Sequence, residues 1–169
     1  MKATGIVRRI DDLGRVVLPK EIRKTMRIRE GDPLEIYTDS SGSIIFKKYS
    51  QLGENTEVVR CLCRALHKAL GLPCAVSDRS AVVAACGAYE DIQDKAISDG
   101  VKDALGARNA EDFPSGIELC QGCKAYRIVP VISAGDILGG IYFLENAENL
   151  QSEKVETLCK SFLQNFFEQ

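Results

Sequence analysis

The first 26 residues alternate between short apolar runs and turn residues. Period-two patterning predicts strands over residues 5–11 and 15–18, and a turn at Leu13–Gly14 separates them. A short helix is expected over residues 19–25, because a proline at a first helical position loses no hydrogen bond. This region is therefore predicted to form two strands followed by a helix of one or two turns.

A β-hairpin is predicted next. Residues 34–39 and 43–49 alternate apolar and polar side chains, and residues 40–42 (Ser-Ser-Gly) supply turn chemistry between them. The order over residues 1–50 is thus β-β-α-β-β. So short a unit with no cysteine or metal staple cannot bury an adequate core alone, and we expect it to dimerise.

The remainder of the chain has the pattern of a second domain over residues 57–169, after a polar hinge at residues 51–56. Gly71 and Pro73 end its first helix. The expected helices and strands give an α+β sandwich in which one sheet face is covered by helices and the other can hold a pocket. We expect helices over residues 58–70, 91–105 and 152–166, and strands over residues 74–77, 81–85, 126–132 and 137–144.

Charge is distributed unevenly along the chain. The formal net charge is −2, but residues 1–50 carry 11 Lys and Arg against 7 Asp and Glu, whereas residues 51–169 carry 11 against 17. Within residues 8–29 the cations outnumber the three acids Asp11, Asp12 and Glu21. The cations of interest are Arg8, Arg9, Arg15, Arg23, Lys24, Arg27 and Arg29.

This basic cluster has two interpretations. It is either a solvated face that is partly paired with the nearby acids, or a surface for double-stranded DNA. Dimerisation favours DNA, because two copies double the positive field and place arginines symmetrically against the two strands of a duplex. Arginine also suits both phosphate oxygens and guanine edges. No helix-turn-helix is apparent, so strands and loops would have to present the contacts.

Catalytic and membrane functions find little support. The single histidine, His67, lies in a predicted amphipathic helix, no Gly-x-Ser-x-Gly elbow accompanies it, and residues 135–140 form a turn rather than a phosphate loop. We therefore expect no enzyme. No run of 18 apolar residues occurs, and residues 1–10 lack the apolar core of a signal peptide, which predicts a cytoplasmic protein without membrane contact.

The seven cysteines are odd in number and irregularly spaced, which argues against a disulfide scaffold. Cys120 and Cys123 have the spacing of half a zinc knuckle or of a redox pair. A second such motif or a histidine pair is missing, so we expect neither a metal nor another cofactor. Because Cys120 lies in a glycine-bearing loop, it is predicted to be the most exposed thiol.

Residues 1–23, Gly31–Ile36 and Lys47–Tyr49 carry a long, specific pattern that resembles the AbrB family of swapped-hairpin transition-state regulators. The whole chain resembles sporulation regulators of this family that have a C-terminal GAF-like domain. The resemblance implies a dimer of interlaced hairpins that contacts DNA through Arg8, Arg15, Arg23 and Lys24, and the charge pattern adds Arg9. Lys24 stands where AbrB has arginine, so it keeps the charge but loses the bidentate fork.

The resemblance further implies a homotetramer joined through helices of the GAF-like domains, which could sense an unidentified small ligand. Two apolar stripes fit either this contact or the core: Val58, Leu62 and Leu66, and Phe162, Phe166 and Phe167. The expected function is a sequence-tolerant, DNA-binding regulator of sporulation genes, acting as activator, repressor or both. The alternatives are a toxin-binding antitoxin or adaptor, and a small-molecule or thiol sensor that does not contact DNA.

Overall fold

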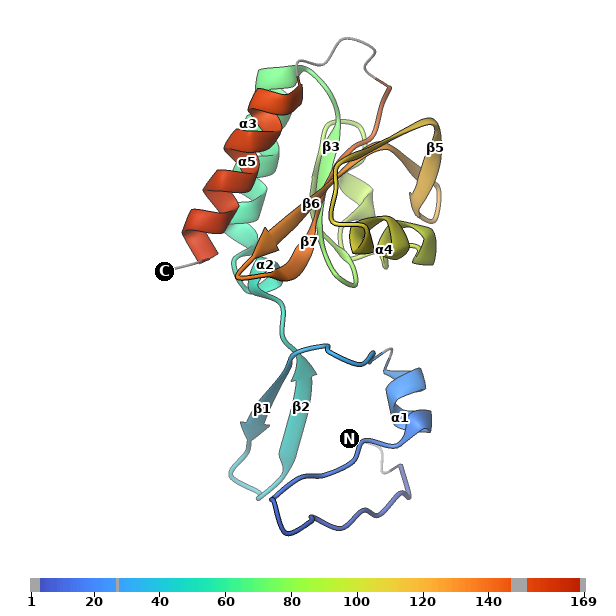
Figure 1. The fold of residues 1–169 in the computed structure, drawn as a ribbon, viewed down its shortest axis with the longest axis vertical. Helices are drawn as coiled ribbons and strands as arrows, with labels where there is room; N and C mark the ends of the chain where they lie inside the picture. Colours follow the sequence, from blue (N-terminus) through green and yellow to red (C-terminus); the bar gives the residue numbers. More distant parts are fainter. Residues whose placement is uncertain (1–3, 27, 147–151, 168–169) are drawn as a thin grey trace. The chain divides into compact units, whose positions relative to one another are not determined.

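The computed structural model describes residues 4–26, 28–146 and 152–167 (Figure 1). The chain divides after Tyr49 into two units, Met1–Tyr49 and Ser50–Gln169. Each unit has its own secondary structure, and the first is much the smaller.

The first unit contains an antiparallel hairpin of β1 (Leu34–Thr38) and β2 (Ile44–Lys48), which confirms the hairpin prediction. Its turn is ordered by Asp39, whose Oδ1 accepts the backbone N–H groups of Ser41 and Ser43, both at 2.9 Å. Side-chain acceptors of this kind are typical of Asp in turns, because they replace a backbone partner.

The short helix predicted over residues 19–25 is present as α1 (Lys20–Thr25), but Pro19 is its N-cap, with an extended ψ of 149°, rather than its first helical residue. The pyrrolidine ring of Pro19 is buried, whereas no residue within α1 is. The helix is therefore held at its start and exposes its polar side chains.

The strands expected at residues 5–11 and 15–18 are not formed in the single chain. Only the turn between them is present, where Gly14 donates its N–H to the carbonyl of Asp11 at 3.0 Å. A strand requires hydrogen bonds to a neighbouring strand, and among the described residues no segment of this chain pairs with them. Their apolar side chains are exposed accordingly, namely Val7, Ile10, Val16 and Val17, as is Leu13 in the turn.

The second unit is built on a five-stranded antiparallel sheet in the order β4-β3-β7-β6-β5. The long β6–β7 hairpin lies at its centre (Figure 1). The strands are β3 (Cys74–Asp78), β4 (Val82–Cys86), β5 (Glu111–Cys120), β6 (Cys123–Ser133) and β7 (Asp136–Phe143).

Helices cover both faces of this sheet (Figure 1). Alternate residues of each strand enter opposite cores: Val76 and Ile141 face the core beneath α3 and α5, whereas Ala75 and Tyr142 face the core beneath η1 and α4. The second face is thus covered rather than open. The helices are α2 (Gln51–Glu54), α3 (Thr56–Leu70), η1 (Glu90–Ile92), α4 (Asp99–Gly106) and α5 (Ser152–Phe167).

Helix α3 ends as predicted at Gly71, which adopts a left-handed conformation with φ of 69°. The segment just before α3, for which a hinge was expected, instead forms α2. Leu52 of α2 is fully buried in the core beneath α3, and Ser50 caps α2 by accepting the N–H of Gly53 at 2.9 Å. Residues 51–56 therefore pack as part of the second unit.

The helix expected over residues 91–105 is wrong in its first half. Asp94 has a positive φ of 65°, and Ala96 forms a β-bridge with Ala81, so the chain is extended before α4. The helix starts only after Ser98, whose Oγ accepts the N–H of Val101 at 3.2 Å.

Strand β5 was not predicted. It contains Pro114 and Gly116, two residue types that argue against a strand when only the sequence is considered. Its pairing with β6 also shifts register between Asp112 and Ile117. Because β5 lies at the edge of the sheet, it has no neighbouring strand on one side, and a proline removes no hydrogen bond between strands on that side.

Candidate nucleic-acid interface

The five cations expected to contact DNA, namely Arg8, Arg9, Arg15, Arg23 and Lys24, are all exposed in the first unit. Arg8 and Arg9 lie in the extended stretch before the turn, and Arg15 follows the turn directly. Arg23 and Lys24 occupy the last turn of α1. The structure places them on three successive local elements of one small unit.

Arg15 is the most precisely held of these side chains. The carboxylate of Asp11 accepts the backbone N–H of Arg15 at 2.7 Å through Oδ1, and its Nε at 2.8 Å through Oδ2. The N–H of Leu13 adds a third hydrogen bond at 3.1 Å. The hydrogen bonds from Arg15 lower the pKa of Asp11, so the carboxylate is ionised throughout the physiological range.

The contact through Nε leaves the terminal nitrogens of Arg15 without a hydrogen bond to any described residue. These two nitrogens are the prongs that approach a phosphate or a guanine edge. Asp11 therefore fixes the direction of the guanidinium without occupying its end.

The other four cations are less constrained. Nη1 of Arg8 donates only to the neighbouring carbonyl of Val7 at 3.3 Å. Among residues 4–26, 28–146 and 152–167, no carboxylate lies within 4.0 Å of Arg8, Arg9, Arg23 or Lys24. The interpretation of this cluster as an internally paired face is thus not supported for these four.

The two remaining cations of the cluster are Arg27 and Arg29. Arg27 lies outside the described residues. The backbone N–H of Arg29 donates to Oδ2 of Asp32 at 2.9 Å, and the same carboxylate pairs with Lys48 at 3.0 Å. Asp32 thereby ties the segment after α1 to the end of β2.

In the second unit, the two apolar stripes divide between core and surface. Leu66 is buried, and Leu62 and Phe167 pack partly against the core. Phe162 and Phe166 are exposed on α5, with ring centroids 6.3 Å apart. Leu158, which is not part of the two stripes named from the sequence, extends this exposed stripe and is 70% accessible.

The prediction that Cys120 is the most exposed thiol is wrong. Cys120 is 2% exposed, because it faces the core beneath α4, whereas Cys61 on α3 is the exposed cysteine. Burial raises the pKa of Cys123 to about 11. Among the described residues, no three His, Cys, Asp or Glu side chains are grouped so that they could hold a metal ion.

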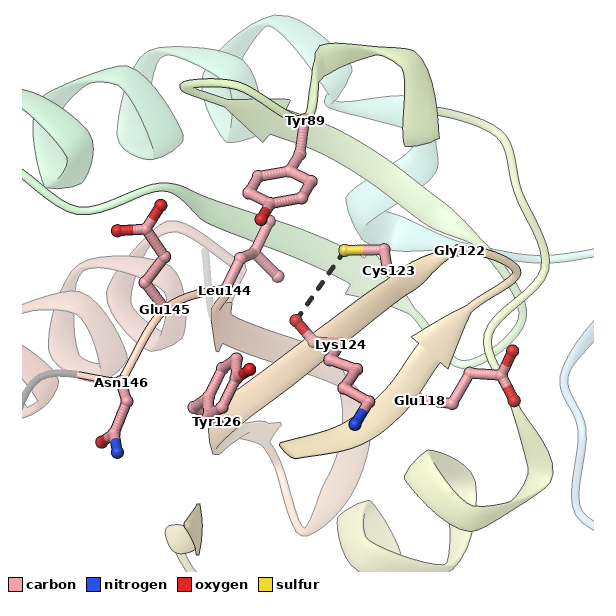
Figure 2. A pocket seen from close by; sticks show the side chains of 9 residues that line it. All are labelled: Tyr89, Glu118, Gly122, Cys123, Lys124, Tyr126, Leu144, Glu145 and Asn146. Atoms are coloured by element: carbon pink, nitrogen blue, oxygen red, sulfur yellow. Dashed lines mark hydrogen bonds between the residues drawn. The ribbon is translucent and has the colours of Figure 1, made fainter. Parts of the chain in front are cut away.

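A pocket of about 630 Å³ lies at the edge of the second unit and was not predicted in position (Figure 2). Its residues come from the loop after β4, from the β5–β6 hairpin and from the end of β7. They are Tyr89, Glu118, Gly122, Cys123, Lys124, Tyr126, Leu144, Glu145 and Asn146. In the part of the chain that the structure describes, no helix is long and apolar enough to span a bilayer.

Two family models match successive parts of the chain. Residues 7–53 match the family described as antidote-toxin recognition MazE, bacterial antitoxin. Residues 54–168 match the family described as Stage V sporulation protein T C-terminal, transcription factor.

Similar proteins extend this picture. Stage V sporulation protein T of Bacillus subtilis (strain 168) is 38% identical over the full length of both chains. The transition state regulatory protein AbrB of the same organism is 61% identical over 49 residues, which are 29% of this chain and 50% of AbrB. The solution structure of the N-domain of the transcription factor AbrB is 60% identical and covers 30% of this chain and 94% of that domain, with a TM-score of 0.27.

An AbrB-like first unit followed by a transcription-factor domain defines a two-part transcription regulator of the α+β class. More particularly, the chain belongs to the Stage V sporulation protein T family.

Proposed function

We propose that this transcription regulator binds double-stranded DNA through paired first units, with Arg8, Arg9, Arg15, Arg23 and Lys24 as the contacting side chains. The observation that carries the proposal is the exposure of these cations, four of them without a carboxylate partner in the described residues, in a segment 61% identical to AbrB. Phosphate contacts supply most of the affinity of such a surface. The similarity to Stage V sporulation protein T extends the proposal to sporulation genes in the cytoplasm, and no enzymatic reaction is assigned.

Dimerisation of the first unit is supported by its exposed apolar side chains. Val7 is 84% accessible, Val17 is 73% and Ile36 is 62%, in a unit whose own sheet has only two strands among the described residues. A lone two-stranded sheet is marginal in water. A second copy that pairs with residues 5–11 and 15–18 would cover these side chains and turn both segments into the strands that their pattern predicts.

Tetramer formation through the GAF-like second unit is supported by α5. Leu158, Phe162 and Phe166 recur every four residues and share one exposed face of the helix. An apolar stripe of this kind is stabilised when it packs against the same stripe of another protomer. Four protomers would then present two DNA-binding dimers.

Fluorescence anisotropy with a labelled duplex tests the proposal. Arg15→Ala should weaken binding by at least about tenfold, since each dimer loses two charge-assisted contacts. The matched control is Lys68→Ala, which removes one exposed charge per chain from α3. Equal affinity of Arg15→Ala and the wild-type protein at low salt would refute the proposed surface.

The antitoxin hypothesis predicts a different outcome of the same experiment. The antitoxin family model over residues 7–53 favours it as a second candidate. A chain that acts only as an adaptor would bind a protein toxin stoichiometrically and show no response of DNA affinity to Arg15→Ala.

A further inference from the structure

The pocket of the second unit is built from chemically distinct walls (Figure 2). Leu144 and Cys123 are buried apolar side chains at its base, and the half-buried rings of Tyr89 and Tyr126 approach it from different elements. The exposed Glu145, which follows Leu144 at the end of β7, adds a carboxylate to the rim.

The position of Tyr126 depends on a glycine in the neighbouring strand. A Cβ at Gly116 would lie 3.2 Å from Cζ of Tyr126 and 3.0 Å from Cδ of Lys124, and Gly116 has a φ of +70°. The side chains of Tyr126 and Lys124 thus lie over the backbone of Gly116, where the Cβ of any other residue type would crowd them. Gly116 lies within the stretch of β5 where the register with β6 shifts, between Asp112 and Ile117.

The charges of the pocket do not balance. Lys124 stands opposite Glu118 across the β5–β6 ladder, and its Nζ donates to the carbonyl of Ser115 at 3.2 Å. Glu145 has no cation within 4.0 Å among the described residues. The hydroxyl groups of Tyr89 and Tyr126 likewise make no hydrogen bond with the described part of the chain.

We propose that this pocket binds a small organic ammonium ion with a branched apolar tail. Glu145 would pair with the ammonium group, the electron-rich faces of Tyr89 and Tyr126 would attract it, and the tail would rest on Leu144 and Cys123. A ligand with a carboxylate but no ammonium group, by contrast, would have Lys124 as its one cationic partner in the pocket lining and would place its negative charge beside Glu118 and Glu145. The site is independent of the DNA-binding proposal.

Two sources share this chemistry, a simple aliphatic amine and a branched-chain amino acid. Isothermal titration of the full-length protein with isoamylamine and with L-leucine distinguishes them, since tighter binding identifies the source. Isovalerate and isoamyl alcohol have the same carbon skeleton with negative charge or no charge, and neither should bind. Equal binding of either control would overturn the proposal, as would failure of both ammonium compounds to bind.

Variants test the assigned roles. Glu145→Gln should reduce the affinity for the ammonium compound by about tenfold, whereas Glu111→Gln, at an exposed position of β5 outside the pocket, should leave it unchanged. Tyr126→Phe keeps the ring and should retain most of the affinity, but Tyr126→Leu should lose several-fold. Unchanged affinity of Glu145→Gln would contradict the proposal. DNA binding by the same variants should match the wild-type protein, so this test fails or succeeds separately from that of the DNA surface.

Discussion

Asp11 holds Arg15 at two points, its backbone N–H at 2.7 Å and its Nε at 2.8 Å. The two residues are four positions apart and lie on either side of one tight turn. Asp11 therefore positions the side chain of Arg15, although its negative charge alone would be expected to weaken DNA binding.

Because of this relationship, the direction in which Asp11→Ala changes the DNA affinity is informative. The variant gains positive net charge, and electrostatics alone would strengthen DNA binding. We expect binding to weaken several-fold instead, because the turn and the Arg15 guanidinium lose their order. Anisotropy at constant salt measures the sign, and Asp12→Ala, which removes a neighbouring charge, is the control. Stronger binding by Asp11→Ala would show that the pair has no positioning role.

A second prediction concerns the buried hydroxyl pair of the second unit. Oγ of Ser77 donates to the carbonyl of Asp78 at 2.7 Å, so the hydroxyl of Tyr142, 2.7 Å away, is the donor to Ser77. Burial also raises the pKa of Tyr142, which keeps this hydroxyl protonated.

Removing one partner of this pair should therefore cost different amounts. Tyr142→Phe removes the donor and should lower the free energy of unfolding by about 1 kcal/mol, whereas Ser77→Ala leaves a buried hydroxyl unpaired and should cost up to about 3 kcal/mol. Urea denaturation of both single variants and of the double variant measures this. A larger loss for Tyr142→Phe than for Ser77→Ala would contradict the assigned direction of the hydrogen bond.

Assembly should depend on the exposed stripe of α5. Phe162→Glu places a charge in the centre of this stripe, and we expect the proposed tetramer to dissociate to a dimer, since burial of an unpaired charge is unfavourable. Asn165→Glu, at another exposed position of the same helix, is the control. Sedimentation velocity gives the oligomeric state, and a tetramer that persists in Phe162→Glu would exclude α5 as the contact.

Thiol reactivity should follow burial rather than sequence context. The native protein should react quickly with iodoacetamide at Cys61 alone, and the remaining six cysteines should react only after unfolding. Mass spectrometry of the modified protein locates the adducts, and Cys61→Ser should abolish the fast phase. Fast modification of Cys120 would show that its side of the sheet opens in solution.

The extent to which sequence predicted the structure follows from how local each feature is. The hairpin around Asp39 and the end of α3 at Gly71 depend on nearby residues, so both were predicted. Strand β5 depends on pairing with β6, and its Pro114 and Gly116 concealed it. The strands at residues 5–11 and 15–18 were predicted from their pattern, but they need a partner strand that the described part of one chain does not supply.

The functional residues divide in the same way. The cations of residues 8–24 are close in sequence, so the amino-acid pattern alone reveals their cluster. The clustering of cations does not specify the direction of the Arg15 side chain, which is set by the contact with Asp11 across the turn. The pocket joins Tyr89, Tyr126 and Glu145 through the tertiary fold. Neither these residues nor the exposure of Cys61 has a signal in local sequence.

The salt dependence of DNA binding tests the central claim most directly. If about four of the five proposed cations on each of two protomers contact a phosphate, a plot of log K against log salt concentration should have a slope of about −7. Arg15→Ala should reduce the magnitude of this slope by about 2, since two contacts are lost from each dimer. A slope near zero, or one that Arg15→Ala leaves unchanged, would contradict a DNA surface formed by these paired cations.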